Sequence, residues 1–366
     1  MKKTRFWIGI GISIVALIFA FRKINVAEVW TALVGADHRL LALSVLPLLL
    51  FLLLRALRWR LLFYPQRGLH IRNLFAVINI GYLLSNIFPA RLGDVARAYL
   101  IGDTERVSRA TAFSTIVAER VLDALCAVGG FFLVTLVSGV VAPSSAPLPA
   151  WMVRSGLVIG AAALAAVAVF IILVWQREWT LHLLDRILLA FHWPGHETMS
   201  LFWKKLARRL RLPFLARMPW ADRHDLGNMA GSLIDGLGGI TTLRLGPPLL
   251  LWSIAIWTSI TIFYWVVLLA FDPQQPWVAG LAFNSVTALG LSVPSSPGAI
   301  GVFEALGRET MVLFGMTPEA ALSYTLTAHA IVYIVYTTLG LLSMVQQNLT
   351  YAEIQKRIST EVKPPS

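Results

Sequence analysis

Two arginines flanking a proline–glycine break form the first candidate site. Arg91 and Arg97 are six residues apart, so in a helix that starts near residue 92 they share roughly one face with Asp94. The amides at a helix N-terminus face an anion readily, and two guanidiniums beside them can hold a phosphate bidentately. The alternative is that the arginines only anchor a loop at the lipid headgroups. The candidate residues are Asn86, Arg91, Asp94 and Arg97, with Pro89 and Gly93 expected to let the backbone turn.

A second set of charges lies inside an apolar run. Glu119 and Asp123 are four residues apart and project from one face of a helix, with Arg120 beside them. A carboxylate at membrane depth is normally paired. Arg120, or the group of Arg91 and Arg97, could supply the partner. Both a structural ion-pair lock and a proton- or headgroup-coupled role fit this pattern.

The third candidate site is a second proline–glycine break, which comes late in the chain. Its hydroxyls and unpaired amides could ligate a headgroup oxygen, and Glu304, one turn past Gly301, would face the same cavity. A purely structural loop is the alternative. His329 could contact this segment, although a hydrogen-bonded core histidine is the favoured interpretation. The residues concerned are Pro294, Ser295, Ser296, Pro297, Gly298, Gly301 and Glu304, with His329 as a further candidate.

The remaining polar residues carry weaker signals. Arg55, Arg58 and Arg60 are expected to reach the cytoplasmic headgroups by snorkelling. The single cysteine, Cys126, excludes an intramolecular disulfide and a CxxC motif. No HExxH, GxSxG or Walker A motif is present, and no GxGxxG has a strand context. The sequence therefore predicts neither a metal site nor a cofactor.

The composition indicates where these sites must lie. Of the 366 residues 57% are hydrophobic and only 14% are charged, which excludes intrinsic disorder and disfavours a soluble domain. The formal net charge is +12. Because nucleic-acid-binding chains are rarely so apolar, we interpret the excess of cations as that of a membrane protein with basic cytoplasmic loops.

Apolar runs predict an all-α bundle that crosses the membrane several times. We expect six full spans, at about 6–22, 40–63, 111–141, 150–175, 247–270 and 322–347. Two shorter segments, 74–88 and 277–293, stop at the proline–glycine breaks and resume as helices at 92–102 and 299–315. Each such pair suits a re-entrant helical hairpin, which is tolerated where it lines a cavity inside the protein.

The cations favour one orientation. With both termini cytoplasmic, 25 of the 31 Lys and Arg residues fall on the cytoplasmic side and 4 outside. The first segment is read as a retained helix, because it lacks a small-x-small cleavage site. The two hairpins then enter from opposite sides, as in an inverted repeat whose functional site lies at the repeat interface.

The domain organisation follows from these spans. Residues 1–350 are predicted to form a single membrane domain, followed by a short cytoplasmic tail at 351–366. The loop 177–244 is basic and contains an amphipathic helical pattern. This helix could lie on an anionic leaflet, or the loop could serve only to keep its end of the protein inside.

The three motifs together resemble the lysylphosphatidylglycerol synthase transmembrane-region family, also called flippase-like domain proteins. The family pattern N-x-x-P-x-R-x-G-E-x-x-R, E-R-x-x-D and P-x-x-P-G-x-x-G-x-x-E is matched in order, over about residues 5–345. One departure is Asp94, where the family usually has Glu. The resemblance implies a plasma-membrane protein related to the flippase half of bacterial aminoacyl-phosphatidylglycerol synthases. Since their large transferase domain has no counterpart in this sequence, aminoacylation is not expected.

The leading hypothesis is a lipid transporter rather than an enzyme. It would move an anionic phospholipid, or a lipid-linked headgroup such as a polyprenyl phosphate, between leaflets, with Arg91 and Arg97 on the phosphate and Glu304 balancing or gating charge. One alternative is a membrane enzyme acting on a lipid phosphate, with Glu119, Asp123 or Glu304 as general base. Another is a non-transporting partner of an envelope-biosynthesis transferase. Membrane lipids and no nucleic acid are the expected partners, and the oligomeric state stays open.

Overall fold

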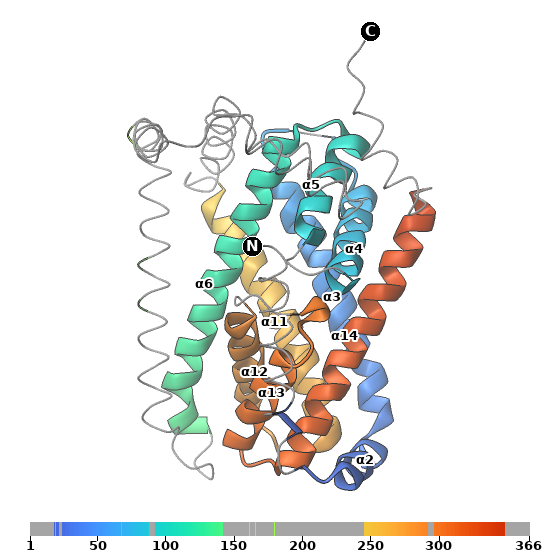
Figure 1. The fold of residues 1–366 in the computed structure, drawn as a ribbon. Coiled ribbons are helices and arrows are strands. Elements are labelled where there is room, and N and C mark those ends of the chain that lie inside the picture. Colours follow the sequence, from blue (N-terminus) through green and yellow to red (C-terminus); the bar gives the residue numbers. More distant parts are fainter. Residues whose placement is uncertain are drawn as a thin grey trace, which may run out of the picture.

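The computed structural model of the chain describes residues 24–66, 68–87, 92–141, 245–291 and 296–347 and a few isolated positions. Within these ranges every regular element is helical, as the sequence predicted (Figure 1). Apart from isolated positions, the expected spans 6–22 and 150–175, the loop 177–244 and the tail 351–366 fall outside the described residues, as do Pro89, Arg91, Pro294 and Ser295.

Among the described residues, four helices are long and apolar enough to cross a membrane. They are α3 (His38–Leu62), α6 (Arg109–Val141), α11 (Gly246–Phe271) and α14 (Pro318–Gln346). Each exceeds the roughly 20 residues that a bilayer requires, and each matches a span predicted from the sequence. In Figure 1, α3 and α14 run upwards while α6 and α11 run downwards.

The outward faces of these helices are apolar. Leu46 on α3, Leu251 on α11 and Leu342 on α14 are 60–69% exposed. Soluble monomers rarely expose such side chains in contiguous patches. The faces therefore suit contact with lipid.

Each broken segment forms a pair of short helices. Helix α4 (Ile71–Ile87) packs on α5 (Leu92–Glu105), and α12 (Trp277–Gly290) packs on α13 (Val302–Leu313). The first pair lies in the upper half of the molecule and the second in the lower half (Figure 1). The short 3-10 helix η3 (Pro297–Ala299), which precedes α13, packs against α4 of the first pair.

Each pair of short helices has its own apolar core. One core joins α4 and α5 to α3 and α6, and the other joins α12 and α13 to α11 and α14. The second core is rich in aromatic rings, with Phe283 at 5.5 Å from Phe303 and 4.9 Å from Tyr324 between ring centroids. Helix α2 (Val26–Gly35) packs on α14 at the lower end.

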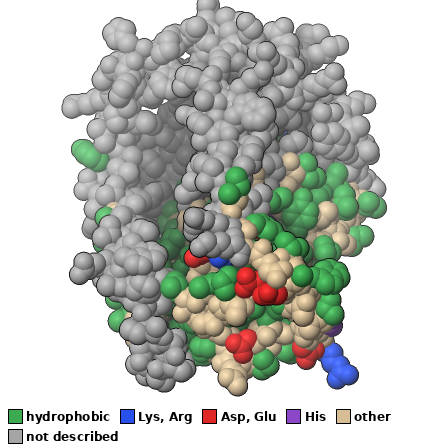
Figure 2. All heavy atoms as spheres, turned by 60° about the horizontal axis from the view of Figure 1, so that its bottom comes forward, with side chains coloured by type: hydrophobic (Ala, Val, Ile, Leu, Met, Phe, Trp, Pro, Cys, Tyr) green, Lys and Arg blue, Asp and Glu red, His purple; other side chains and the backbone are tan. Residues whose placement is uncertain are grey.

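The described part of the lower end is acidic. Figure 2 looks onto this end and shows acidic side chains with few basic ones among apolar patches. The helix ends that meet there carry the acids Glu28, Asp37, Asp272, Glu309 and Glu319, against the cations Arg39 and Arg308. The two ends of the molecule are therefore expected to interact differently with the two sides of a membrane.

Candidate functional site

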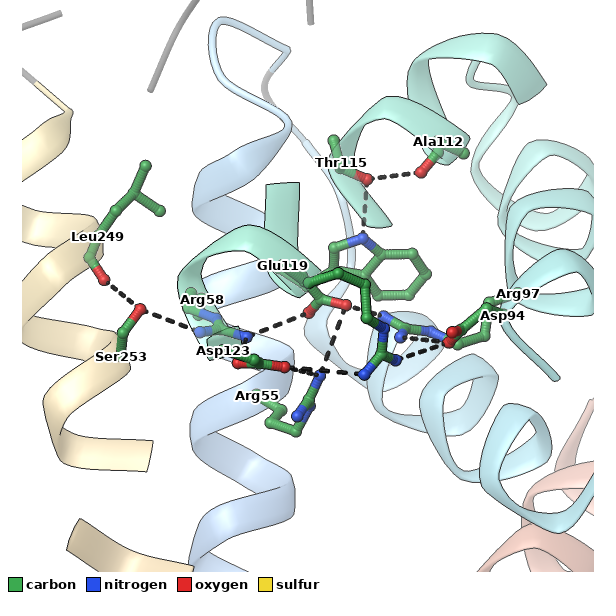
Figure 3. Close-up of polar contacts among 12 residues, drawn as sticks. Arg55, Arg58, Asp94, Arg97, Ala112, Thr115, Glu119, Asp123, Leu249 and Ser253 are labelled. Atoms are coloured by element: carbon green, nitrogen blue, oxygen red, sulfur yellow. Dashed lines mark hydrogen bonds and ion pairs between the residues drawn. The ribbon is translucent and has the colours of Figure 1, made fainter. Parts of the chain in front are cut away.

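A network of ion pairs joins α3, α5 and α6 inside the upper half of the molecule (Figure 3). Arg97 of α5 donates to Glu119 of α6 at 2.8 Å. From α3, Arg58 and Arg55 donate to Asp123 of α6 at 2.7 and 3.1 Å. We call the whole set the arginine cluster: Arg55, Arg58, Asp94, Arg97, Glu119, Arg120 and Asp123.

One edge of the arginine cluster is more open. Arg120 donates to Asp94 at 2.7 Å and lies 3.8 Å from Asp123, and Asp94 in turn lies 3.6 Å from Arg97. The side chains of Arg120 and Asp94 are 37% and 21% exposed. These two residues are therefore the most accessible part of the cluster.

The rest of the cluster is deeply buried. Glu119 and Arg58 are fully buried, and Arg97 and Arg55 are 3% and 5% exposed. Beyond its bond to Arg97, the Glu119 carboxylate lies 3.7 Å from Arg55 and 4.0 Å from Arg58. The Glu119 carboxylate thus lies within ion-pair distance of three guanidiniums. Removal of either partner from such a buried pair leaves a charge that is costly to bury.

The cluster carries a net positive charge in the described part of the chain. Four arginines face three carboxylates, which leaves one cation in excess. A guanidinium has five N–H donors, and here the buried Nε atoms of all four arginines have no hydrogen-bond partner among the described residues. An excess buried cation with spare donors is stabilised by an anion.

Neighbouring side chains hold the arginines in place. The guanidinium of Arg97 lies 4.2 Å from the ring centroid of Trp59, a cation–π contact, and the Trp59 indole donates to Thr115 at 2.9 Å. Arg58 donates to the Ser253 hydroxyl of α11 at 2.9 Å. On α3, Arg58 and Trp59 follow Arg55 by three and four positions, so all three side chains lie on roughly one helical face. The cluster is therefore a preorganised element of the fold.

Gly93 has a different role from the one expected. It lies in the first turn of α5, and a Cβ placed there would overlap the Gly81 carbonyl oxygen and the Ser85 hydroxyl of α4. Its missing side chain therefore lets α4 and α5 approach each other closely, rather than letting the chain turn. This close packing brings the Arg97 side chain against Gly81 and positions α5 beside α6.

The expectation for Arg55 and Arg58 was wrong. Both were expected to snorkel to the headgroups, yet both are buried and ion-paired, whereas Arg60 is exposed. Charged residues at helical spacing within an apolar run are the signal that could have found them. Arg55 and Arg58 are three residues apart, and a similar spacing, of four residues, was used to select Glu119 and Asp123. The cytoplasmic excess of cations counted from the sequence is correspondingly smaller.

The pairing expected for the second motif is present. Glu119 and Asp123 share one face of α6, and Arg97 supplies the partner of Glu119. The ion pair of Asp94 with Arg97 likewise agrees with their spacing on α5. Arg91 is outside the described residues, so its place beside this network stays a prediction.

The third motif forms a local cap rather than an open anion site. The Glu304 carboxylate accepts from the Gly301 amide at 2.6 Å and lies 2.5 Å from His329 Nδ1, which confirms that His329 contacts this segment. Glu304 is 3% exposed. Gly298 and Gly301 have φ values of 65° and 94°, which explains why glycine occupies both positions. Both Glu304 oxygens are therefore engaged within the fold.

Two further candidate residues make structural contacts. The Ser296 hydroxyl donates to the Ile300 carbonyl at 3.0 Å across the short η3 turn. Asn86, at the end of α4, donates to the Thr337 hydroxyl of α14 at 3.4 Å. The first contact is local to η3, and the second joins the end of α4 to α14. The side chain of Pro297, the first residue of η3, is not described.

Metal-ligating side chains do not converge in the described part of the chain: no group of three or more His, Cys, Asp or Glu residues there could hold an ion. The carboxylates of the arginine cluster face guanidiniums instead. The arrangement can therefore bind an anion by charge and hydrogen bonds.

Comparison with known proteins finds relatives that match most of this chain. The chain is similar to the glycosyltransferase AglD of Haloferax volcanii, with 26% identity over 360 residues. That match covers 93% of this chain and 54% of the relative, so the chain spans about half of the relative's length. It is also 24% identical over 351 residues to a UPF0104 membrane protein of Methanothermobacter thermautotrophicus, covering 90% of this chain and 92% of that one.

A family model covers nearly the whole chain. The model of the lysylphosphatidylglycerol synthase TM region matches residues 6–340, which include all three motifs and every described helix but the last few residues of α14. With its apolar spans, the protein is a polytopic integral membrane protein. The chain belongs to the lysylphosphatidylglycerol synthase transmembrane-region family.

Proposed function

We propose that the protein binds the phosphate of an anionic lipid at the arginine cluster and moves that lipid between the leaflets. The observation that carries this proposal is the buried excess of one cation among four arginines and three carboxylates. Charge at membrane depth is costly and is retained where it serves transport or binding. A phosphate would balance this charge and accept from guanidinium donors that have no partner within the described residues.

The carboxylates of the cluster would act as resident counter-ions. Asp123 holds Arg55 and Arg58, and Glu119 holds Arg97. An arriving phosphate would share these guanidiniums, and the carboxylates would take them back on its departure. Such an exchange of one anion for another keeps the arginines paired throughout, so the headgroup need not be bound irreversibly.

The paired helices would form the path. We propose that α4–α5 and α12–α13 are re-entrant hairpins that enter the plasma membrane from opposite sides, with the upper end and both termini cytoplasmic. The meeting of η3 with α4 and the acidic lower end support this arrangement (Figures 1 and 2). The headgroup would pass through the polar middle while its chains stay in the lipid.

We propose transport without chemical conversion. A lipid-phosphate enzyme would need a carboxylate free to act as general base. Glu119 and Asp123 are instead ion-paired to arginines, and Glu304 accepts from its own helix cap. Partnership with a glycosyltransferase is the second candidate, favoured by the similarity to AglD, about half of whose length this chain matches. Such a role would make a polyprenyl-phosphate-linked sugar the lipid.

The test compares two arginines of α3. The variant Arg58→Gln removes a buried member of the cluster, and Arg60→Gln removes an exposed charge two residues away. Each variant is reconstituted with fluorescent phosphatidylglycerol, and the leaflet of the lipid is followed by its accessibility to a membrane-impermeant quencher. We expect Arg58→Gln to abolish translocation and Arg60→Gln to retain it.

Folding must be separated from function in this comparison. The double variant Arg58→Gln/Asp123→Asn removes both partners of the 2.7 Å pair and so keeps the excess of one cation, while Arg55 retains Glu119 at 3.7 Å. We expect this variant to fold and to regain part of the translocation that Arg58→Gln loses. A folded Arg58→Gln variant that flips the lipid at the wild-type rate would contradict the proposal. Altered lipid mass after incubation with wild-type protein would instead favour an enzyme.

A further inference from the structure

An apolar groove lies between α6, α11 and α12, apart from the charges described above. Its volume is about 530 Å³, within the range of roughly 300–1,000 Å³ that ligand pockets show. Its lining is apolar except for Thr258 and Thr261, and includes the chain's single cysteine, Cys126. The lining residues Leu250 and Ile254 are about half exposed, so the groove opens to the surface of the bundle.

The groove begins where the arginine cluster ends. On α6, the lining residue Cys126 comes one helical turn after Asp123. On α11, the lining residues Leu250 and Ile254 flank Ser253, whose hydroxyl accepts from Arg58. Figure 3 shows Ser253 facing Arg58 from α11. The groove and the arginine cluster are therefore neighbours along both α6 and α11.

We infer that this groove holds one hydrocarbon chain of the same lipid whose phosphate the arginine cluster binds, an inference that rests on the proposed function. The polarity of the combined site, charged at one end and apolar along the other, matches an amphiphile whose chain is anchored by its headgroup. Inside a bilayer, burial of apolar surface against protein rather than lipid supplies no hydrophobic gain. The chain would therefore be held by close packing and by the phosphate contact.

Gly129 offers a way to fill the groove without disturbing the helices. It lines the groove, and a Cβ built on it meets nothing within 4 Å. The neighbouring Gly130 is unsuitable, because its Cβ would meet the Ser285 hydroxyl. The matched control is Leu136→Trp, on the same helix α6 at a position 61% exposed.

The experiment uses phosphatidylglycerol that carries a photoactivatable diazirine in one acyl chain, at low mole fraction in phosphatidylcholine vesicles containing the full chain. Cross-linked peptides are located by mass spectrometry. We expect wild-type cross-links at residues 125–133 and 250–262 that unlabelled phosphatidylglycerol competes away. In Gly129→Trp these should fall about tenfold, because the indole fills the space of the chain, while Leu136→Trp leaves them unchanged.

Three outcomes overturn one claim or the other. Groove cross-links that persist in Gly129→Trp, or that never exceed those on the exposed α14 residues Leu341 and Leu342, overturn the groove as a chain site. Competition by phosphatidylcholine as effective as that by phosphatidylglycerol overturns the proposed headgroup site and leaves the groove as a chain site.

Discussion

The two pairs of short helices share a backbone plan and differ in their chemistry. The α4–α5 pair contributes to a network of seven charges that joins three helices, with an excess cation. The α12–α13 pair holds one buried carboxylate, Glu304, which caps its own helix and contacts His329. Two similar broken elements thus differ in charge. The α4–α5 pair belongs to a cluster with one cation in excess, whereas the carboxylate of the α12–α13 pair has its partners nearby. This contrast supports our proposal that the first pair recognises an anion and that the second mainly shapes the path.

The largest effect on stability is expected for a substitution of Glu119, in the arginine cluster to which the first pair contributes. Because Glu119 is fully buried within 4.0 Å of three arginines, Glu119→Gln should lower the free energy of unfolding by about 3–5 kcal/mol. Denaturation of the purified protein in detergent measures this loss. A change below about 1 kcal/mol, the value typical of a surface pair, would show that the network is not a buried one.

The close packing of α4 on α5 predicts the next largest effect. Gly93→Ala places a methyl group against the Gly81 carbonyl oxygen, so overpacking should cost about 1–3 kcal/mol. Gly129→Ala on α6 enters open space and should be neutral or stabilise by up to about 1 kcal/mol through helix propensity. Thermal unfolding of the two variants side by side checks this. Equal stability of the two would remove the packing role of Gly93.

The smallest effect is expected in the second pair. Glu304→Gln retains an oxygen to accept from the Gly301 amide and loses only the charge of the His329 contact. We expect a cost of about 1–2 kcal/mol, as for a hydrogen bond to a charged group, with lipid translocation preserved. Stability and translocation are measured on the same preparation. Lost translocation in a stable variant would give Glu304 the gating role and end the contrast between the two pairs.

Much of the fold could be predicted from the sequence because membrane thickness sets the length of an apolar run. The four spans in the described residues and both helix pairs follow from run length and from the proline–glycine breaks. The number of full spans and the entry of the hairpins into the bilayer stay predictions.

The site was harder to predict than the fold. The spacing of Glu119 and Asp123 correctly placed them on one face of α6. Arg55 and Arg58 were missed as members of the cluster because snorkelling to the headgroups was a sufficient explanation for them. Residue spacing alone does not reveal tertiary contacts, so the close approach of Gly93 to Gly81 could not be predicted. The pairing of Glu304 with the Gly301 amide likewise depends on the backbone geometry of that turn, which the sequence pattern does not reveal.

The central claim, an excess positive charge that binds a lipid phosphate, is tested most directly at the open edge of the cluster. There Arg120→Gln removes the excess charge and Asp94→Asn doubles it, and both side chains are partly exposed, so the fold is least affected. Retention of phosphatidylglycerol against phosphatidylcholine by the purified protein is measured by native mass spectrometry. We predict that Asp94→Asn retains most, the wild type less and Arg120→Gln about tenfold less than the wild type, a difference of about 1.4 kcal/mol. Equal retention by all three proteins, or the reverse order, would contradict the account.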